Sequence, residues 1–312
     1  MIRRFLTHWQ NVLGLLFVSG YIVLAVFAPQ IAPPTDPQNP DVYKFIGPAT
    51  GQVPQPPSAQ APLGTALMPV GLTRGMYSID VFYSVVWGAR SALQLGLTAA
   101  VATAIFGTLI GAFSGYLGGW VDSLTLRITD AFLTIPLIAG VWLIGQVFFP
   151  PYSFFSDPPP IRVFMEGLGL NAVIMGFILF SWMPYARLIN ANVARLKTTD
   201  FILASQALGA GKRRMIFKHL LPNAVSPAIV LLARDIGGMV ILEAAFTFLG
   251  LGLGNVWGEV LVNNRSWIVG AGGDPFVYWW VYIPMTLALI FFGVGWNLLG
   301  DGLNDVLNPR EA

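Results

Sequence analysis

The stretch SALQLGLTAAVATAIFGTLIGAFSGYLGGWV (Ser91–Val121) contains no Asp, Glu, Lys or Arg. A transmembrane helix needs about 20 predominantly apolar residues, so this run is long enough to cross a bilayer. The whole chain is similar: 55% of its 312 residues are hydrophobic and 10% are charged, with a mean hydropathy of +0.67. A soluble domain usually carries about 25% charged residues. The sequence therefore predicts an integral membrane protein, and a net charge of +2 does not suggest a nucleic-acid partner.

Five further apolar runs raise the number of predicted transmembrane helices to six. Helices are the expected spanning elements, because the apolar pattern is continuous and backbone groups in lipid must be satisfied internally. Arg234, Asp235 and Glu243 interrupt one of the runs. The expected fold class is an all-α integral membrane protein with six transmembrane helices. The additional runs are 12–28, 130–157, 166–187, 222–254 and 274–301.

The distribution of cationic residues predicts the orientation of the six helices, because cytoplasmic loops are enriched in Lys and Arg. With the N-terminus inside, eleven Lys and Arg residues are cytoplasmic and four are outside, so both termini are expected in the cytoplasm. Residues 1–30 then form the N-terminus and first helix, and residues 90–312 form the membrane core. Between them, residues 31–89 form a Pro-rich extracytoplasmic segment. Eleven of the 23 prolines lie between Pro29 and Pro69, which predicts extended or irregular structure.

The second predicted helix carries small residues at every fourth position: Ala99, Thr103, Gly107, Gly111 and Gly115. Small residues at this spacing let another helix approach closely within a membrane. Close packing inside the same subunit and packing against a partner subunit both fit the pattern. The first interpretation is the simpler one.

The stretch ALGAGKRRMIFKHLLPN (Ala207–Asn223) concentrates four cationic residues in a chain with few charges. Before it, Thr199 or Asp200 is suited to cap the N-terminus of a short apolar helix, and Gly209 is suited to end that helix. An exposed helix of this kind fits a groove in another protein. Alternatively, it lies on the membrane surface, where the basic residues meet anionic lipid. The residues alone leave both interpretations open.

The same loop resembles a known family of membrane proteins. Residues 203–210 read L-A-S-Q-A-L-G-A, and residues 216–223 read I-F-K-H-L-L-P-N. This order is similar to the cytoplasmic E-A-A-x-A-L-G-A loop of permease subunits of binding-protein-dependent ABC importers. The resemblance is strongest to the second permease of dipeptide, oligopeptide and nickel importers, and it extends over about residues 63–310. Other matching stretches are 63–65, 88–93, 115–122, 127–136, 184–187, 243–252 and 297–303.

The resemblance implies the type I importer permease fold, with a coupling loop at about residues 193–222. A short coupling helix in this loop, between the fourth and fifth transmembrane helices, would dock in a groove of a cytoplasmic ATPase. The expected partners are a homologous second permease, two ATPases and an extracytoplasmic substrate-binding protein, in a prokaryotic inner membrane. ATP would be used by the partners, with no cofactor bound by this chain. The implied coupling residues are Leu203, Ala204, Ser205, Ala207, Leu208, Gly209 and Ala210.

The implied substrate is a peptide, with metal chelates and sugars as alternatives within the family. Two departures from the family pattern affect function. Leu203 stands where the family has a glutamate, so an ion pair with the ATPase is lost. The family also continues G-T-D-x-x-G-R-D before the second helix, whereas here Ala66 follows Thr65 and a longer segment precedes Asp80. The outer mouth is therefore expected to differ.

The sequence contains no recognisable catalytic or metal-binding motif. G-x-x-x-x-G-K-[ST], H-E-x-x-H and G-x-S-x-G are absent, and there is no cysteine. Charged residues within a membrane helix are costly unless they face water or a partner. Arg234, Asp235 and Glu243 are therefore candidates for the translocation path or the interface with the second permease, although local pairing would also satisfy them. Asp130 is expected to pair with Arg127.

The rival interpretation is an ATPase-independent channel or membrane scaffold. It accounts for the hydropathy and the small-residue stripe, but not for the order of motifs in the loop. An intramembrane enzyme is less favoured, because no catalytic set is visible.

Overall fold

The computed structural model describes residues 2–37, 40–48, 53–70, 75–149, 158–250, 255–270 and 273–307, most of which are helical. Four helical stretches are long and apolar enough to cross a membrane: Trp9–Val26, Val81–Leu117, Ala172–Leu196 and Trp279–Leu307. Two bent helix pairs raise the number to six if each pair forms one span. These are Gly119–Leu133 with Leu137–Phe148, bent by 89°, and Lys212–Ala224 with Ser226–Phe248, bent by 61°.

The contacts divide the described chain into two compact units, each built from separate parts of the sequence. Unit 1 comprises Met1–Val12, Leu97–Ile236 and Leu298–Ala312. Its complete elements are α1 (Ile2–Thr7), α5 (Gly119–Leu133), α6 (Leu137–Phe148), α7 (Pro160–Gly167), α8 (Ala172–Phe180), α9 (Met183–Leu196), α10 (Asp200–Ala207), α11 (Lys212–Arg214), the π-helical turn η2 (Met215–Leu220) and α12 (Leu221–Ala224).

Unit 2 comprises Leu13–Gly96 and Gly237–Asn297. It contains α3 (Ala28–Ile31), the strands β1 (Phe45–Pro48), β2 (Thr65–Val70) and β3 (Gly75–Asp80), and α14 (Val256–Val269). Four helices contribute residues to both units: α2 (Trp9–Val26), α4 (Val81–Leu117), α13 (Ser226–Phe248) and α15 (Trp279–Leu307). The division into residues 1–30, 31–89 and 90–312 stays a prediction.

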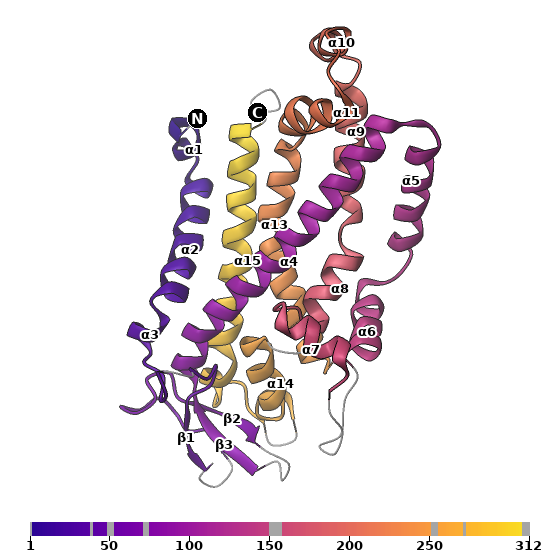
Figure 1. Cartoon of the computed structure of the whole chain (residues 1–312). Helices are drawn as coiled ribbons and strands as arrows, with labels where there is room; N and C mark the ends of the chain where they lie inside the picture. The colour runs from indigo at the N-terminus through magenta and orange to yellow at the C-terminus, as the bar shows by residue number, and fades with distance from the viewer. Residues whose placement is uncertain are drawn as a thin grey trace. The chain divides into compact units, whose positions relative to one another are not determined.

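The Pro-rich segment contains an antiparallel three-stranded sheet with the order β1-β3-β2, which corrects the expectation of an all-α fold (Figure 1). Pro48 lies in β1 and Pro69 in β2, whereas the central strand β3 has no proline. Proline cannot donate to a sheet ladder, so it is confined to edge strands, as it is here. A high proline content is therefore compatible with a sheet, provided that the prolines lie in the edge strands and not in the middle strand.

The β2–β3 hairpin explains why the sequence departs from the family pattern after Thr65. The register pairs Thr65 directly with Asp80, so the two ends of the longer segment are neighbours across the ladder. Asp80 then precedes the first residue of α4. Its Oδ1 accepts hydrogen bonds from the backbone N–H groups of Phe82 at 2.9 Å and Tyr83 at 3.3 Å. The described parts of the longer segment thus pair as β2 and β3, and β3 returns the chain to the start of α4.

A buried asparagine attaches the hairpin to α14. The side chain of Asn264 is fully buried, and its Oδ1 accepts a hydrogen bond from the Leu67 N–H at 2.8 Å. Its Nδ2 donates to the Leu67 carbonyl at 2.9 Å, so both groups of the amide bind the edge strand β2. A buried amide is tolerated when its hydrogen bonds are satisfied, and here they also fix the strand to one helix position.

In unit 1, the small-residue stripe of α4 packs against α9 of the same chain. A Cβ atom added at Gly107 or at Gly111 would lie 2.3 Å from a backbone oxygen of α9 or its cap, and one added at Gly115 would lie 2.7 Å from the Asn190 oxygen. No real Cβ makes contacts this short. Packing inside the same subunit, the simpler interpretation of the stripe, is confirmed at these three positions.

Two sequence predictions near α5 need correction. The run 130–157 is not one straight helix: α5 begins at Gly119, and the chain bends between α5 and α6. Residues 150–157 of that run lie outside the described residues. Asp130 forms an ion pair with Arg187 of α9 instead of Arg127. The ion pair links two helices, whereas a bond to Arg127 would have stayed within one turn.

We expect Gly111→Ala to destabilise the protein, because the added methyl group would meet the backbone of Ala186 and force α4 away from α9. Overpacking of this kind costs about 1–3 kcal/mol. The matched control is Gly238→Ala in α13, where no atom lies within 4 Å of the added Cβ. The control is expected to be neutral or slightly stabilising, since alanine favours a helix. Thermal unfolding in detergent measures both, and equal stability of the two variants would contradict the close approach.

The carboxyl of Asp80 provides a prediction that depends on pH. Burial is the main effect on its pKa and raises it above the ordinary value, while the two N–H bonds and Lys44 partly oppose the rise. A raised carboxyl pKa contributes stability at low pH that is lost as pH increases above about 4, the ordinary carboxyl range. Asp80→Asn keeps the acceptor without the charge, so its stability relative to the wild type should increase with pH.

Asp80→Ala is the comparison variant, because it removes the acceptor and should lose about 1 kcal/mol of capping energy. Thermal unfolding of both variants from pH 4 to pH 8 separates the cap from the charge. If Asn and Ala behaved alike at every pH, the hydrogen bonds at the start of α4 would not matter.

Candidate functional site

The short helix expected in the basic loop is α10, which runs from Asp200 to Ala207. Thr199 occupies the position before it in an extended conformation, but its side chain makes no capping hydrogen bond. Its hydroxyl instead donates to the Leu196 carbonyl at 2.6 Å, at the end of α9. Thr199 therefore occupies the N-cap position of α10 as predicted, but the predicted hydrogen bond between its side chain and the start of α10 is not formed. Asp200 lies in the first turn, where a negative charge favours the helix dipole.

Gly209 ends α10 as expected, with a φ of +82°. Its N–H donates to the Gln206 carbonyl at 2.9 Å, and the next N–H, of Ala210, donates to the Ser205 carbonyl at 3.1 Å. This pair of bonds is the Schellman motif, which satisfies carbonyls at a helix end and requires a left-handed residue. Glycine adopts this conformation without a steric penalty, so Gly209 fixes where α10 stops and which way the chain leaves it.

One residue anchors α10 to the rest of unit 1. Ile202 is fully buried in a cluster with Val193 of α9 and with Met215, Ile216 and Leu220 of η2. The other large apolar side chains of this segment stay exposed: Phe201 by 46%, Leu203 by 49% and Leu208 by 89%. In Figure 1, α10 extends beyond the ends of α9 and α11. The helix is therefore held on one face and presents apolar surface on the others.

The base on which α10 rests is held by polar contacts of α9. Asn190 donates from Nδ2 to Ser114 Oγ of α4 at 2.8 Å and to Asp122 Oδ1 of α5 at 2.5 Å. Lys197 Nζ donates to the Gly115 carbonyl at 3.2 Å, near the C-terminus of α4. Satisfied polar contacts in an apolar surrounding are strong and directional.

Leu203, the position where the family has a glutamate, lines a cavity of about 510 Å³. Lys197 and Lys212 line the same cavity, together with Gln206. A glutamate at this position would therefore have lysines of its own chain nearby. The leucine removes that interaction as well as any ion pair with a partner.

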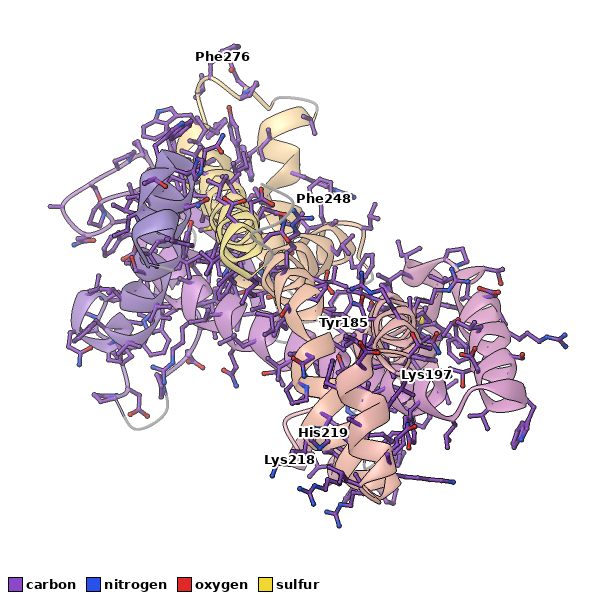
Figure 2. The ribbon with its side chains drawn as sticks, turned by 90° about the horizontal axis from the view of Figure 1, so that it is seen from above. Tyr185, Lys197, Lys218, His219, Phe248 and Phe276 are labelled. Carbon is purple, nitrogen blue, oxygen red and sulfur yellow. The ribbon has the colours of Figure 1, made fainter. Side chains whose placement is uncertain are left out.

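The three charged residues predicted in α13 lie in different environments and do not form one site. Arg234 forms an ion pair with Asp301 of α15, and both side chains are about half exposed. Asp235 accepts a hydrogen bond from the hydroxyl of the buried Tyr185 at 2.8 Å. Neighbouring residues of a helix face different directions, which explains their separate partners. Figure 2 shows Tyr185 among the packed helices of unit 1.

Glu243 belongs to unit 2 and is fully buried. Thr247 donates to its Oε1 at 3.2 Å, and Oε2 has no hydrogen-bond partner in the described part of the chain. A buried carboxylate with an unsatisfied oxygen is costly, so it needs a functional or structural reason. A role for Arg234, Asp235 or Glu243 in the translocation path or in the interface with the second permease stays a prediction.

Sequence reasoning missed a second, half-buried contact between an acid and a phenol, in unit 2. The hydroxyl of Tyr43 donates to Glu259 Oε2 of α14. The pKa of Tyr43 is raised mainly by burial, and then by the negative charges of Glu259 and Glu243. No sequence signal links residues so far apart in the chain. Asn190 was also missed, although a polar residue inside an otherwise apolar helix face was a usable signal.

The comparisons with known proteins agree with this architecture. The model of the family described as binding-protein-dependent transport system inner membrane component matches residues 107–312. A second model, the N-terminal TM domain of oligopeptide transport permease C, matches residues 1–57. The first match covers more than half of the chain. The chain therefore belongs to the family of inner membrane components of binding-protein-dependent transport systems.

Individual relatives match over almost the whole chain. The dipeptide transport system permease protein DppC of Alkalihalophilus pseudofirmus is 30% identical, over 96% of this chain and 85% of its own length. The glutathione transport system permease protein GsiD of Pectobacterium atrosepticum is also 30% identical, over 99% and 89%. The oligopeptide transport system permease protein OppC of Bacillus subtilis is 28% identical, over 98% and 88%. The chain is thus a membrane permease component of the second-permease type.

The conformation at Gly209 gives a prediction for coupling. Valine at this position would meet the penalty of the left-handed region, about 1–2 kcal/mol, and would redirect the chain after α10. We expect Gly209→Val to insert normally and to lose substrate-stimulated ATPase activity in the assembled transporter. Asparagine tolerates the left-handed conformation, so Gly209→Asn is the matched control and should retain most of that activity.

Reconstituted transporter with each variant allows stimulated ATPase activity and membrane content to be measured together. Normal stimulation with Gly209→Val would show that the end of α10 does not affect coupling. An equal loss in both variants would show that the backbone conformation is not the cause.

Proposed function

We propose that this chain is the transmembrane permease subunit of an ATP-driven importer for peptides, and that α10 is its coupling helix. The observation that supports this is the construction of α10. It is a short helix anchored by Ile202 alone, closed by the Schellman motif at Gly209, with exposed apolar side chains around it. An exposed helix of this kind fits a groove in a partner protein.

In this proposal, the four single spans and the two bent pairs form six transmembrane segments. Both termini and α10 face the cytoplasm, in accordance with the bias of Lys and Arg. The chain contributes half of the translocation path and a homologous second permease contributes the other half. Two ATPases bind from the cytoplasm, and a substrate-binding protein delivers substrate from outside. This chain binds no cofactor, and its partners use the ATP.

The proposed substrate is a peptide. The relatives are named as dipeptide, oligopeptide and glutathione transport permeases, and all three of these substrates contain peptide bonds. Metal chelates and sugars remain the alternatives. The buried Glu243 and the pair of Asp235 with Tyr185 are the residues proposed to contribute to the path or to its lining helices.

The test is co-purification. The tagged chain is expressed with the neighbouring transport genes, extracted in mild detergent, and its partners are identified by mass spectrometry. We expect a second permease and ATPase subunits. Leu208→Asp should lose the ATPases and keep the second permease, because a charge replaces the most exposed apolar side chain beside α10.

Val269→Asp is the matched control. Val269 ends α14 and is 81% exposed, so the same substitution there should leave the ATPases bound. Recovery of the chain alone, with the neighbouring genes expressed, would favour a channel or scaffold without an ATPase. Loss of the ATPases with both variants would show that the loss does not depend on the surface beside α10, and it would contradict the role of α10 as the coupling helix.

A further inference from the structure

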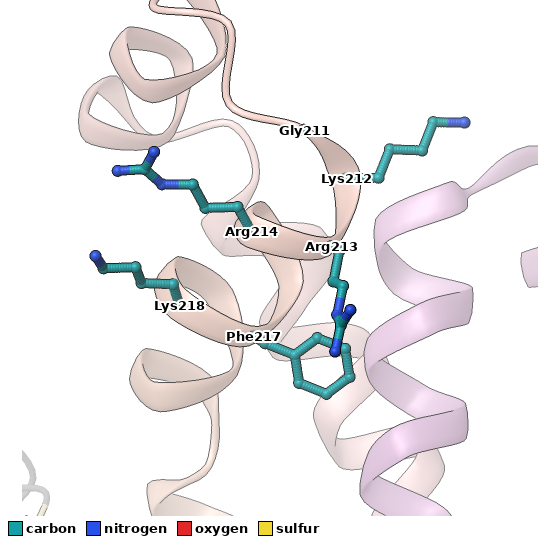
Figure 3. A pocket seen from close by; sticks show the side chains of 6 residues that line it. All are labelled: Gly211, Lys212, Arg213, Arg214, Phe217 and Lys218. Atoms are coloured by element: carbon teal, nitrogen blue, oxygen red, sulfur yellow. The ribbon is translucent and has the colours of Figure 1, made fainter.

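The four clustered cations do not lie on α10. Lys212, Arg213 and Arg214 form α11, and Lys218 lies in η2. These side chains, with Gly211 and Phe217, line a second cavity of about 710 Å³, which shares Lys212 with the cavity at Leu203 (Figure 3). All four cations are exposed, and none takes part in an ion pair within the part of the chain that the structure describes. The loop therefore carries two distinct surfaces, one apolar and one basic.

The basic cluster, defined as Lys212, Arg213, Arg214 and Lys218, is held in place from behind. In η2, the side chains of Met215, Ile216 and Leu220 are buried in the core of unit 1. The exposed positions of the same turn carry Phe217 and Lys218. Figure 3 shows Arg214 and Lys218 extending to one side and Lys212 to the other. The cations are thus fixed on a packed turn and do not belong to a flexible tail.

An apolar surface adjoins the cluster. The ring of Phe217 contacts Phe113 of α4 edge to face, with ring centroids 5.9 Å apart, and the two rings are 44% and 41% exposed. Phe113 lies in the last two turns of α4, a helix long and apolar enough to span the membrane. The cations therefore meet an aromatic surface at the end of a spanning helix, where headgroups and acyl chains of a bilayer adjoin.

We propose that the basic cluster binds the phosphate-containing headgroup of an anionic phospholipid, with an acyl chain along Phe217 and Phe113. Uncompensated cations next to a spanning helix attract anionic headgroups, and each contributes on the order of fivefold in affinity. A soluble anion would use the cations and leave the exposed rings in contact with water. An acidic protein surface would also leave the membrane-side rings uncovered. The lipid satisfies both parts of the surface at once.

Binding there would support the proposed coupling helix, a consequence that rests on the proposed function. The inner face of η2 packs against Ile202, the anchor of α10. A lipid on the outer face would hold η2 against the membrane. A displacement of α10 by a partner would then be transmitted to the helices and would not separate the loop from the membrane. The lipid site itself does not depend on this consequence.

The test uses the full chain with the partners that co-purify, and native mass spectrometry with added phosphatidylglycerol or phosphatidylcholine. The variant is Lys212→Gln with Arg213→Gln, the two cations that extend to the side of Phe217 in Figure 3. The matched control, Arg127→Gln with Arg195→Gln, removes the same charge from exposed positions predicted on the same side of the membrane. We expect phosphatidylglycerol binding to weaken on the order of 25-fold in the variant, about fivefold for each cation removed, and to stay unchanged in the control.

A second variant, Lys212→Arg with Arg213→Lys, keeps the charges and should keep lipid binding, which separates a loss of charge from a loss of folding. Equal losses in variant and control would overturn the proposal in favour of general surface charge. Unchanged phosphatidylglycerol binding in the variant would also overturn the proposal. If such a variant lost the ATPases, the basic cluster would be a contact with protein and not with lipid. Complete displacement of phosphatidylglycerol by inorganic phosphate would identify a site for soluble anions and also overturn it.

Discussion

The close approach of α4 and α9 is the contact on which the rest of unit 1 depends. Apolar side chains gain little by packing against each other in lipid, so helices associate there through tight backbone contact and hydrogen bonds. Gly107, Gly111 and Gly115 provide the contact, and Asn190 binds α4 and α5 together with two hydrogen bonds. Because α9 leads directly into α10, this arrangement also sets where α10 emerges. A larger side chain in the stripe would push α9 away from α4 and so displace the start of α10.

The loop after α9 presents two different kinds of exposed surface, one apolar and one cationic. Its buried residues are few and strongly apolar: Ile202 from α10, and Met215, Ile216 and Leu220 from η2. The exposed surface of α10 is mostly apolar, and that of α11 and η2 is cationic apart from Phe217. The two interpretations that the sequence left open, a protein groove and a lipid surface, therefore fit different parts of the loop. Leu203 stands beside Lys197 and Lys212, where a glutamate would have tied α10 to the basic part.

Local signals in the sequence predicted local features well. Uncharged runs indicated a membrane protein with several apolar helices, of which four are long enough to span, and Gly209 predicted the end of α10. Hydropathy and left-handed backbone conformation depend on neighbouring residues, so both are visible in the sequence. Features that depend on distant residues were missed or mistaken. Asp130 pairs with Arg187, and Asn264 binds Leu67, across many residues of sequence. The sheet was missed because eleven prolines in 29–69 indicated irregular structure, although the prolines within its strands lie only at the edges. The two units could not be predicted either, because each combines segments that are far apart in the sequence.

The hairpin shows why this departure from the family pattern is compatible with the fold. An insertion is tolerated when its ends already lie close together, since loop closure then adds little strain. Thr65 and Asp80 are direct partners in the β2–β3 register, so the residues between them leave and return at one point. Asp80 then caps the start of α4, because its carboxyl accepts hydrogen bonds from the N–H groups of Phe82 and Tyr83. The added surface is free to differ, because Asn264 holds β2 at Leu67, near the base of the hairpin.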